Sequence, residues 1–206
     1  MHIAIEGMDG VGKTTVCRIL AQKLGFTFVE KPLHYIFDDS PQSVEQYQKI
    51  ARRVNESPDR DFTAWFYGLN NLFLHSKFKG QNIITDRHIV SNYCWSGAGC
   101  NSDIYDLLIK KIGMPDYTII LYADPQAIEY RLKQRDENDP NLSKLALSEL
   151  AYARMISFCR EKKFPFTVVD TSDNNSPEQI ANLIVYQLNK LIYNQEIPFG
   201  EFKYEK

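Results

Sequence analysis

The stretch that decides the fold is EGMDGVGKTT, residues 6–15. It fits the pattern G-x-x-x-x-G-K-[ST], follows the apolar residues HIAI and opens a helical pattern at Lys13. In such a strand–loop–helix unit, glycines let backbone N–H groups face phosphate oxygens, the lysine reaches the outer phosphates and the threonine hydroxyl can bind Mg²⁺. The stretch predicts a nucleoside triphosphate site. The expected phosphate-binding residues are Gly7, Gly10, Val11, Gly12, Lys13, Thr14 and Thr15.

Strand and helix patterns alternate along the rest of the chain. Segments rich in β-branched and aromatic residues lie at 2–6, 26–30, 82–86, 117–123 and 166–170. Helical patterns lie at 13–24, 44–56, 61–78, 102–112, 125–135, 142–163 and 177–192. This alternation predicts an α/β fold with a parallel sheet covered on both faces, and ligands bind beyond the carboxyl ends of such strands. The length of 206 residues predicts a single domain over 1–206.

Composition narrows the class of protein. The net charge of −2, from 24 basic and 26 acidic residues, argues against a nucleic-acid or membrane-surface protein. No apolar run approaches the ~20 residues that span a bilayer, and the start of the chain has a strand pattern instead of a signal-peptide pattern. We expect a cytoplasmic protein with reduced thiols, because no CxxC spacing links its cysteines, which are Cys17, Cys94, Cys100 and Cys159.

Other nucleotide-binding classes lack their sequence signatures here. A GTPase would carry N-K-x-D at a strand end, but the pair Asn189–Lys190 lies inside a helical pattern and is followed by Leu-Ile. The transporter signature LSGGQ is absent. The remaining class is the small kinases.

Four motifs together resemble the thymidylate kinase family. They are EGMDGVGKTT, DRHIVSN at 86–92, PDYTIILYADPQAIEYRLKQR at 115–135 and VVDTSD at 168–173. The resemblance implies a three-layer α/β/α fold with a five-stranded parallel sheet of order 2-3-1-4-5 and a short lid at about 131–143. It also implies ATP as phosphoryl donor, Mg²⁺ as cofactor and small-molecule nucleotides as partners, and it allows a homodimer.

The same resemblance assigns roles around the loop. Asp9 would face the acceptor, Arg87 would bind the acceptor phosphate, and Asp86 with Thr14 would hold Mg²⁺, Asp86 through water. An arginine at a strand end suits a forked phosphate contact on chemical grounds as well. Without the loop upstream, Asp86 and Arg87 would be read as a surface ion pair in a turn.

The lid is the expected source of a further positive charge. One subgroup of the family has an arginine in the loop where this chain has Gly10. Arg131 and Arg135 are the candidate catalytic residues of the lid, because they lie four apart on one helix face. The alternative is a solvated basic helix end favoured by the helix dipole.

The expected acceptor pocket lies between the second and third strands. The resemblance places Phe62, Phe66 and Asn70 of the 61–78 helix there, together with Ser91, Asn92 and Trp95, although an aromatic stripe at this spacing is also typical of a core. Three features depart from the family: Asn70 stands where a base-reading arginine is expected, EKPLHYI at 30–36 replaces R-E-P-G-G, and the lid is poor in arginine. We therefore expect looser base discrimination.

The leading prediction is phosphoryl transfer from ATP to a deoxynucleoside monophosphate, dTMP first. The close alternative is a deoxynucleoside kinase acting on a sugar hydroxyl, for which Glu30 could serve as the base. A third reading, motivated by the sparse lid, is a non-catalytic nucleotide-binding module.

Overall fold

The computed structural model describes residues 1–97, 99, 101–173 and 176–194, without the side chains of Pro41 and 191–194. Cys100 and the tail from 195 onward lie outside the described residues. None of the helices in the described part of the chain is long and apolar enough to cross a membrane.

A five-stranded parallel sheet forms the centre of the fold, in the predicted order β2-β3-β1-β4-β5. The register pairs Asp86 with both Ile5 and Glu30, and Gly7 with Leu121. The carboxyl ends of β1, β2 and β3 therefore meet at one edge. The strands are β1 (His2–Gly7), β2 (Thr27–Glu30), β3 (Ile83–Asp86), β4 (Tyr117–Tyr122) and β5 (Phe166–Asp170).

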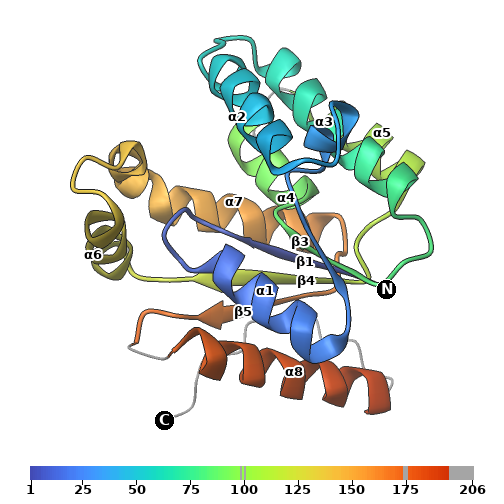
Figure 1. Ribbon diagram of the computed structural model, residues 1–206, viewed down its shortest axis with the longest axis vertical. Coiled ribbons are helices and arrows are strands. Elements are labelled where there is room, and N and C mark those ends of the chain that lie inside the picture. Colours follow the sequence, from blue (N-terminus) through green and yellow to red (C-terminus); the bar gives the residue numbers. More distant parts are fainter. Residues whose placement is uncertain (98, 100, 174–175, 195–206) are drawn as a thin grey trace.

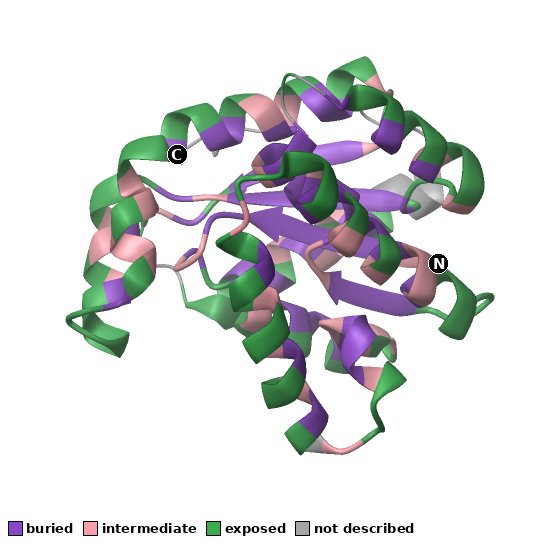
Figure 2. Ribbon diagram, turned by 90° about the horizontal axis from the view of Figure 1, so that it is seen from above, coloured by how far each residue is buried: buried purple, intermediate pink, exposed green. Residues whose placement is uncertain are grey.

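Helices cover both faces of this sheet. On one face α1 (Lys13–Leu24) packs against α8 (Pro177–Asn194), and Figure 1 shows the two side by side. The helices of the other face are α3 (Arg60–Lys77), α4 (Ile89–Asn92), α5 (Ser102–Ile112) and α7 (Ser148–Glu161), and α2 (Pro41–Asn55) packs on α3. Strands β1, β3 and β4 are almost wholly buried (Figure 2) and β5 mostly so, whereas β2 at the sheet edge is partly exposed. The apolar runs of the buried strands form the core.

The predicted helix at 142–163 is wrong in its first part. The segment consists of a 3₁₀ helix, η3 (Pro140–Leu147), followed by α7. Asp139 fixes the start of η3 because its carboxylate accepts the N–H of Asn141, and none of the η3 residues is fully buried. Without a buried face, the segment gains little from extending the α-helix toward its N-terminus. Figure 1 shows α6 (Pro125–Arg135), which precedes η3, beyond the carboxyl ends of the strands.

Two further short elements carry no clear sequence pattern. A 3₁₀ helix, η1 (Pro32–Ile36), follows β2, and a π-helical turn, η2 (Tyr93–Gly97), follows α4. Both lie beside the edge of the sheet where the strands end, and so they shape the surroundings of the site.

Candidate active site

The glycine loop has the backbone that its sequence requires. Gly7 has a φ of 137°, and a β-carbon there would lie 2.4 Å from the carbonyl oxygen of Leu121 on β4. Gly10, with a φ of 88°, packs against Ile128 and Leu132 of α6, 3.0 and 3.1 Å from where its β-carbon would stand. A side chain at position 10 would therefore strain the backbone and push the side chains of Ile128 and Leu132 aside.

The remaining loop residues prepare a phosphate cradle at the start of α1. Gly12 has a φ of 92° and is exposed, as is Thr15, whereas Val11 is buried beneath the loop. The first N–H groups of α1 have no partner within the helix and favour an anion.

Lys13 is buried, and its ammonium donates a 2.6 Å hydrogen bond to the Met8 carbonyl. Burial and the nearby Arg87 charge lower the pKa of Lys13, while Asp86 and Asp9 act in the opposite direction. A phosphate above the loop would offer this ammonium a charged partner in place of a neutral carbonyl.

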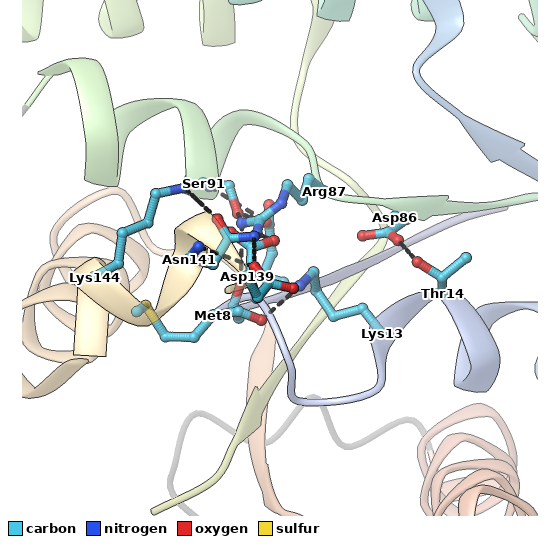
Figure 3. A network of polar contacts seen from close by, with 12 residues as sticks. Met8, Lys13, Thr14, Asp86, Arg87, Ser91, Asp139, Asn141 and Lys144 are labelled. Carbon is cyan, nitrogen blue, oxygen red and sulfur yellow. Dashed lines mark hydrogen bonds and ion pairs between the residues drawn. The ribbon is translucent and has the colours of Figure 1, made fainter. Parts of the chain in front are cut away.

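The Thr14 hydroxyl donates a short hydrogen bond to the Asp86 carboxylate, as Figure 3 shows. Both side chains offer oxygen atoms, which are the ligands that Mg²⁺ prefers, so the pair fits this ion. In the part of the chain that the structure describes, no group of three or more His, Cys, Asp or Glu side chains could hold a metal.

Arg87 joins the end of β3 to the loop. Its guanidinium donates to the Gly7 carbonyl at 2.9 Å, to the Ser91 hydroxyl at 3.1 Å and to the Asp9 carboxylate at 2.7 Å. Its backbone is left-handed, with a φ of 72°, a strained conformation that is commonly kept at functional sites. Burial disfavours the charged forms of Arg87 and Asp9, but their mutual attraction, with that of the other charges nearby, outweighs it. The pKa of Arg87 is therefore raised. The pKa of Asp9 is lowered, with Lys13 and Lys144 contributing.

Glu6 is a site residue that the sequence analysis did not identify. Its carboxylate is fully buried and accepts the backbone N–H groups of His88 and Ser91 at 3.0 and 3.2 Å, as well as the Ser91 hydroxyl. It therefore fixes the turn that presents Arg87. A single carboxylate ending an otherwise apolar strand was the available signal. Burial raises the pKa of Glu6 to about 7, against the opposing hydrogen bonds from Ser91 and the charge of Arg87.

We expect Glu6→Gln to change how stability depends on pH. Between pH 4.5, the ordinary pKa of the group, and about 7, the folded protein keeps a proton that the unfolded chain releases. The stability from Glu6 is thus fully present below 4.5 and lost as the pH rises through 7. The free energy of unfolding of the variant should rise by roughly 2–3 kcal/mol relative to wild type between pH 5 and 8.

Urea unfolding of both proteins at several pH values gives this difference. Burial lowers the pKa of His2 to about 4 and also lowers that of His88, which makes both proteins less stable as the pH falls from 6.5. That slope is common to both proteins and cancels in the difference. A difference that stays constant with pH would contradict the assignment.

The two predicted lid arginines bond to residues outside the loop, although the Thr171 hydroxyl beside Arg131 itself lies 3.4 Å from the Val11 carbonyl oxygen of the loop. Arg131 donates to the carbonyl of Thr171 and, at 3.3 Å, to its hydroxyl, beyond the end of β5. Arg135 pairs with Asp139. Their catalytic role stays a prediction. A residue of η3 that was not predicted, Lys144, instead reaches Asp9, with 3.4 Å between its ammonium nitrogen and a carboxylate oxygen.

The predicted acceptor residues separate into two groups. Asp9, Arg87 and Ser91 form one hydrogen-bonded cluster. The Asn92 amide, in contrast, lies in the core: it donates to the Ala64 carbonyl at 3.2 Å and accepts the Tyr105 hydroxyl at 3.0 Å. A base contact by Asn92 stays a prediction and would require that amide to leave its partners.

Phe62, Phe66 and Asn70 lie on α3, and Trp95 lies in η2. Phe62 is 51% exposed, whereas Phe66 and Trp95 are half-buried. Phe66 stacks on Tyr47 with 6.0 Å between ring centroids. The Asn70 oxygen accepts the N–H of Leu33 at 3.2 Å, which leaves its NH₂ group as a donor.

Glu30, the candidate base of the alternative reading, ends β2 beside Asp86. Its carboxylate forms an ion pair with Lys31 and lies 3.9 Å from an Arg18 nitrogen. Lys31 has a left-handed backbone, with a φ of 49°, like Arg87 on the neighbouring strand.

Comparison with known proteins agrees with this geometry. A model of the thymidylate kinase family matches residues 5–184. The probable thymidylate kinase of Pyrobaculum aerophilum is 25% identical over 197 residues, which cover 92% of this chain and 97% of that protein. The thymidylate kinase of Nautilia profundicola is 29% identical over 184 residues, which cover 84% and 90%.

The fold is also found among solved structures. Thymidylate kinase from Candida albicans superposes with a TM-score of 0.65 at 17% identity and covers 98% of this chain and 96% of its own. Proteins named putative adenylate kinase and deoxyguanosine kinase match as well, so the comparisons support nucleotide kinase activity without fixing the acceptor. Because the family model matches most of this chain, the chain belongs to the thymidylate kinase family of nucleoside monophosphate kinases.

Proposed function

We propose that the protein transfers the γ-phosphoryl group of ATP to dTMP, giving dTDP and ADP. The observation that carries the proposal is the Asp9–Arg87 ion pair, which stands between the phosphate loop and the end of β3. This pair supports the proposal because a guanidinium at this point could make a forked contact with the phosphate of an acceptor beside the ATP in the loop.

The donor half of the site uses the loop and the first turn of α1. Backbone N–H groups would hold the β- and γ-phosphates, and Lys13 would move its ammonium from the Met8 carbonyl onto them. Thr14 and Asp86 would hold Mg²⁺, which neutralises phosphate charge when bound.

The acceptor half uses Arg87 to orient the monophosphate. One phosphate oxygen of dTMP attacks the γ-phosphorus of ATP, a new P–O bond forms, and the bond between that phosphorus and the β–γ bridging oxygen breaks, releasing ADP. No protein nucleophile takes part. Residues of the chain act through positioning and charge, in a site that the lid, about 131–143 with η3, closes from water.

A second candidate function is phosphorylation of a deoxynucleoside. The placement of Glu30 beside Asp86 favours it, since a carboxylate there could accept a sugar hydroxyl proton. The ion pair with Lys31 weakens Glu30 as a base, because a paired carboxylate is a poorer proton acceptor.

A coupled assay with ATP, Mg²⁺ and a panel of acceptors tests the proposal. We expect dTMP to have the highest kcat/KM, with slower turnover of dUMP and dCMP, because the NH₂ group of Asn70 can donate to a ring oxygen or nitrogen of each. If thymidine or another nucleoside exceeds every monophosphate, the second candidate holds. Glu30→Gln should then abolish turnover, whereas it should reduce dTMP kinase activity only slightly.

A further inference from the structure

We propose that Lys144 of η3 binds the acceptor phosphate together with Arg87, so that it sets the preference for a monophosphate over a nucleoside. This inference rests on the proposed function, since it names a further residue of the same acceptor site. Figure 3 shows the Lys144 side chain extending from η3 toward the end of β3, where Arg87 lies.

The ammonium group of Lys144 has a neutral amide as its nearest partner and only a distant carboxylate. Its ammonium nitrogen lies 2.8 Å from the Asn141 side-chain oxygen but 3.4 Å from the Asp9 carboxylate, which is a long separation for an ion pair. It also lies 5.7 Å from the centroid of the Trp95 ring, and its side chain is 43% exposed. The group is therefore held near Asp9 and yet remains open to a ligand.

The other basic residues of the segment 125–147, all of it described, bond to partners other than Asp9. Arg131 bonds to Thr171, Arg135 to Asp139, and Lys133 pairs with Glu129 one turn earlier on α6. In the loop itself, Lys13 is the one basic residue, and Gly10 packs against Ile128 and Leu132 of α6. Lys144 is thus the cation of the segment 125–147 that forms an ion pair with a loop residue, Asp9.

The charges around Asp9 indicate how Lys144 would act when a monophosphate binds. Asp9 is the ion-pair partner that Arg87 and Lys144 share. A monophosphate brings about two negative charges, which is enough for both cations at once. It would bind between them from opposite sides, Arg87 on the sheet and Lys144 on the lid segment, and a nucleoside could not.

The experiment measures binding of dTMP and of thymidine to wild type, Lys144→Met and Lys144→Arg. The methionine keeps the apolar stem and removes the charge. We expect about tenfold weaker dTMP binding or more, the usual effect of one lost charge-assisted hydrogen bond, with thymidine binding changed less than about twofold. Lys144→Arg should recover most of the loss. Lys133→Met, on the exposed face of α6, is the matched control and should bind both ligands like wild type.

Each result has a distinct meaning. Equal weakening of dTMP and thymidine in Lys144→Met would assign Lys144 a structural role and overturn the inference, as would unchanged dTMP binding. The proposed function is judged separately, on the wild type alone, by whether it binds and phosphorylates dTMP in preference to thymidine.

Discussion

Lys13→Met is expected to abolish phosphoryl transfer while the protein stays folded. The ammonium of Lys13 is the only part of the side chain that the substitution removes, and it stands inside the loop where the outer phosphates of ATP would lie. Loss of such a clamp on developing charge should lower kcat by on the order of 10²–10³-fold or more.

The Lys13→Met substitution should lower activity without lowering the stability of the fold. The ammonium is buried with a neutral carbonyl as its hydrogen-bond partner, and burial lowers its pKa, so the charge is costly to the folded state. The melting temperature of Lys13→Met should therefore equal or exceed that of wild type. Lys23→Met, at the other end of α1 in an ion pair with Glu178, serves as the control for activity. A Lys13→Met enzyme with near-normal turnover would refute the phosphate-loop assignment.

The sequence predicts the parts of the molecule that local chemistry dictates. The glycine loop, the five strands and α1, α5 and α6 follow from residue type and spacing alone, and their observed bounds agree closely with those predicted. The strand order was expected from the resemblance to the family alone. The meeting of Thr14 with Asp86 was expected because parallel strands bring their carboxyl ends to one edge of the sheet.

The contacts that the sequence does not predict join residues that are far apart in the chain. Glu6 reads as the last residue of a strand, and its role appears only when the fold brings the turn at His88 and Ser91 over it. Lys144 lies within an apparent helix, and it approaches Asp9, 135 residues away, only because that helix is replaced by η3. The Asn92 amide likewise meets Ala64 and Tyr105 through packing that no local pattern encodes.

Arg87→Ala is expected to impair use of the acceptor far more than binding of ATP. Arg87 directly follows β3 and bonds to Asp9 and Ser91, so its guanidinium is directed to the acceptor side of the loop. Losing a forked contact to a phosphate should raise the KM for dTMP and lower kcat/KM by on the order of 10²-fold. The affinity for ATP should change by less than about threefold, a small effect in free energy.

The contacts of Arg87 with the loop require a control for structural damage. Its bond to the Gly7 carbonyl ties the end of β3 to the loop, and removing Arg87 takes away the closest ion-pair partner of Asp9. Arg87→Lys keeps a charge near Asp9 but cannot make three bonds in one plane, so it should fold like wild type and still lose much of the acceptor affinity. Arg87→Gly relieves the left-handed backbone and separates strain from chemistry. The test is to titrate ATP and dTMP separately into each variant and to record its thermal unfolding. Weaker ATP binding with unaltered dTMP binding would show that Arg87 belongs to the donor half of the site.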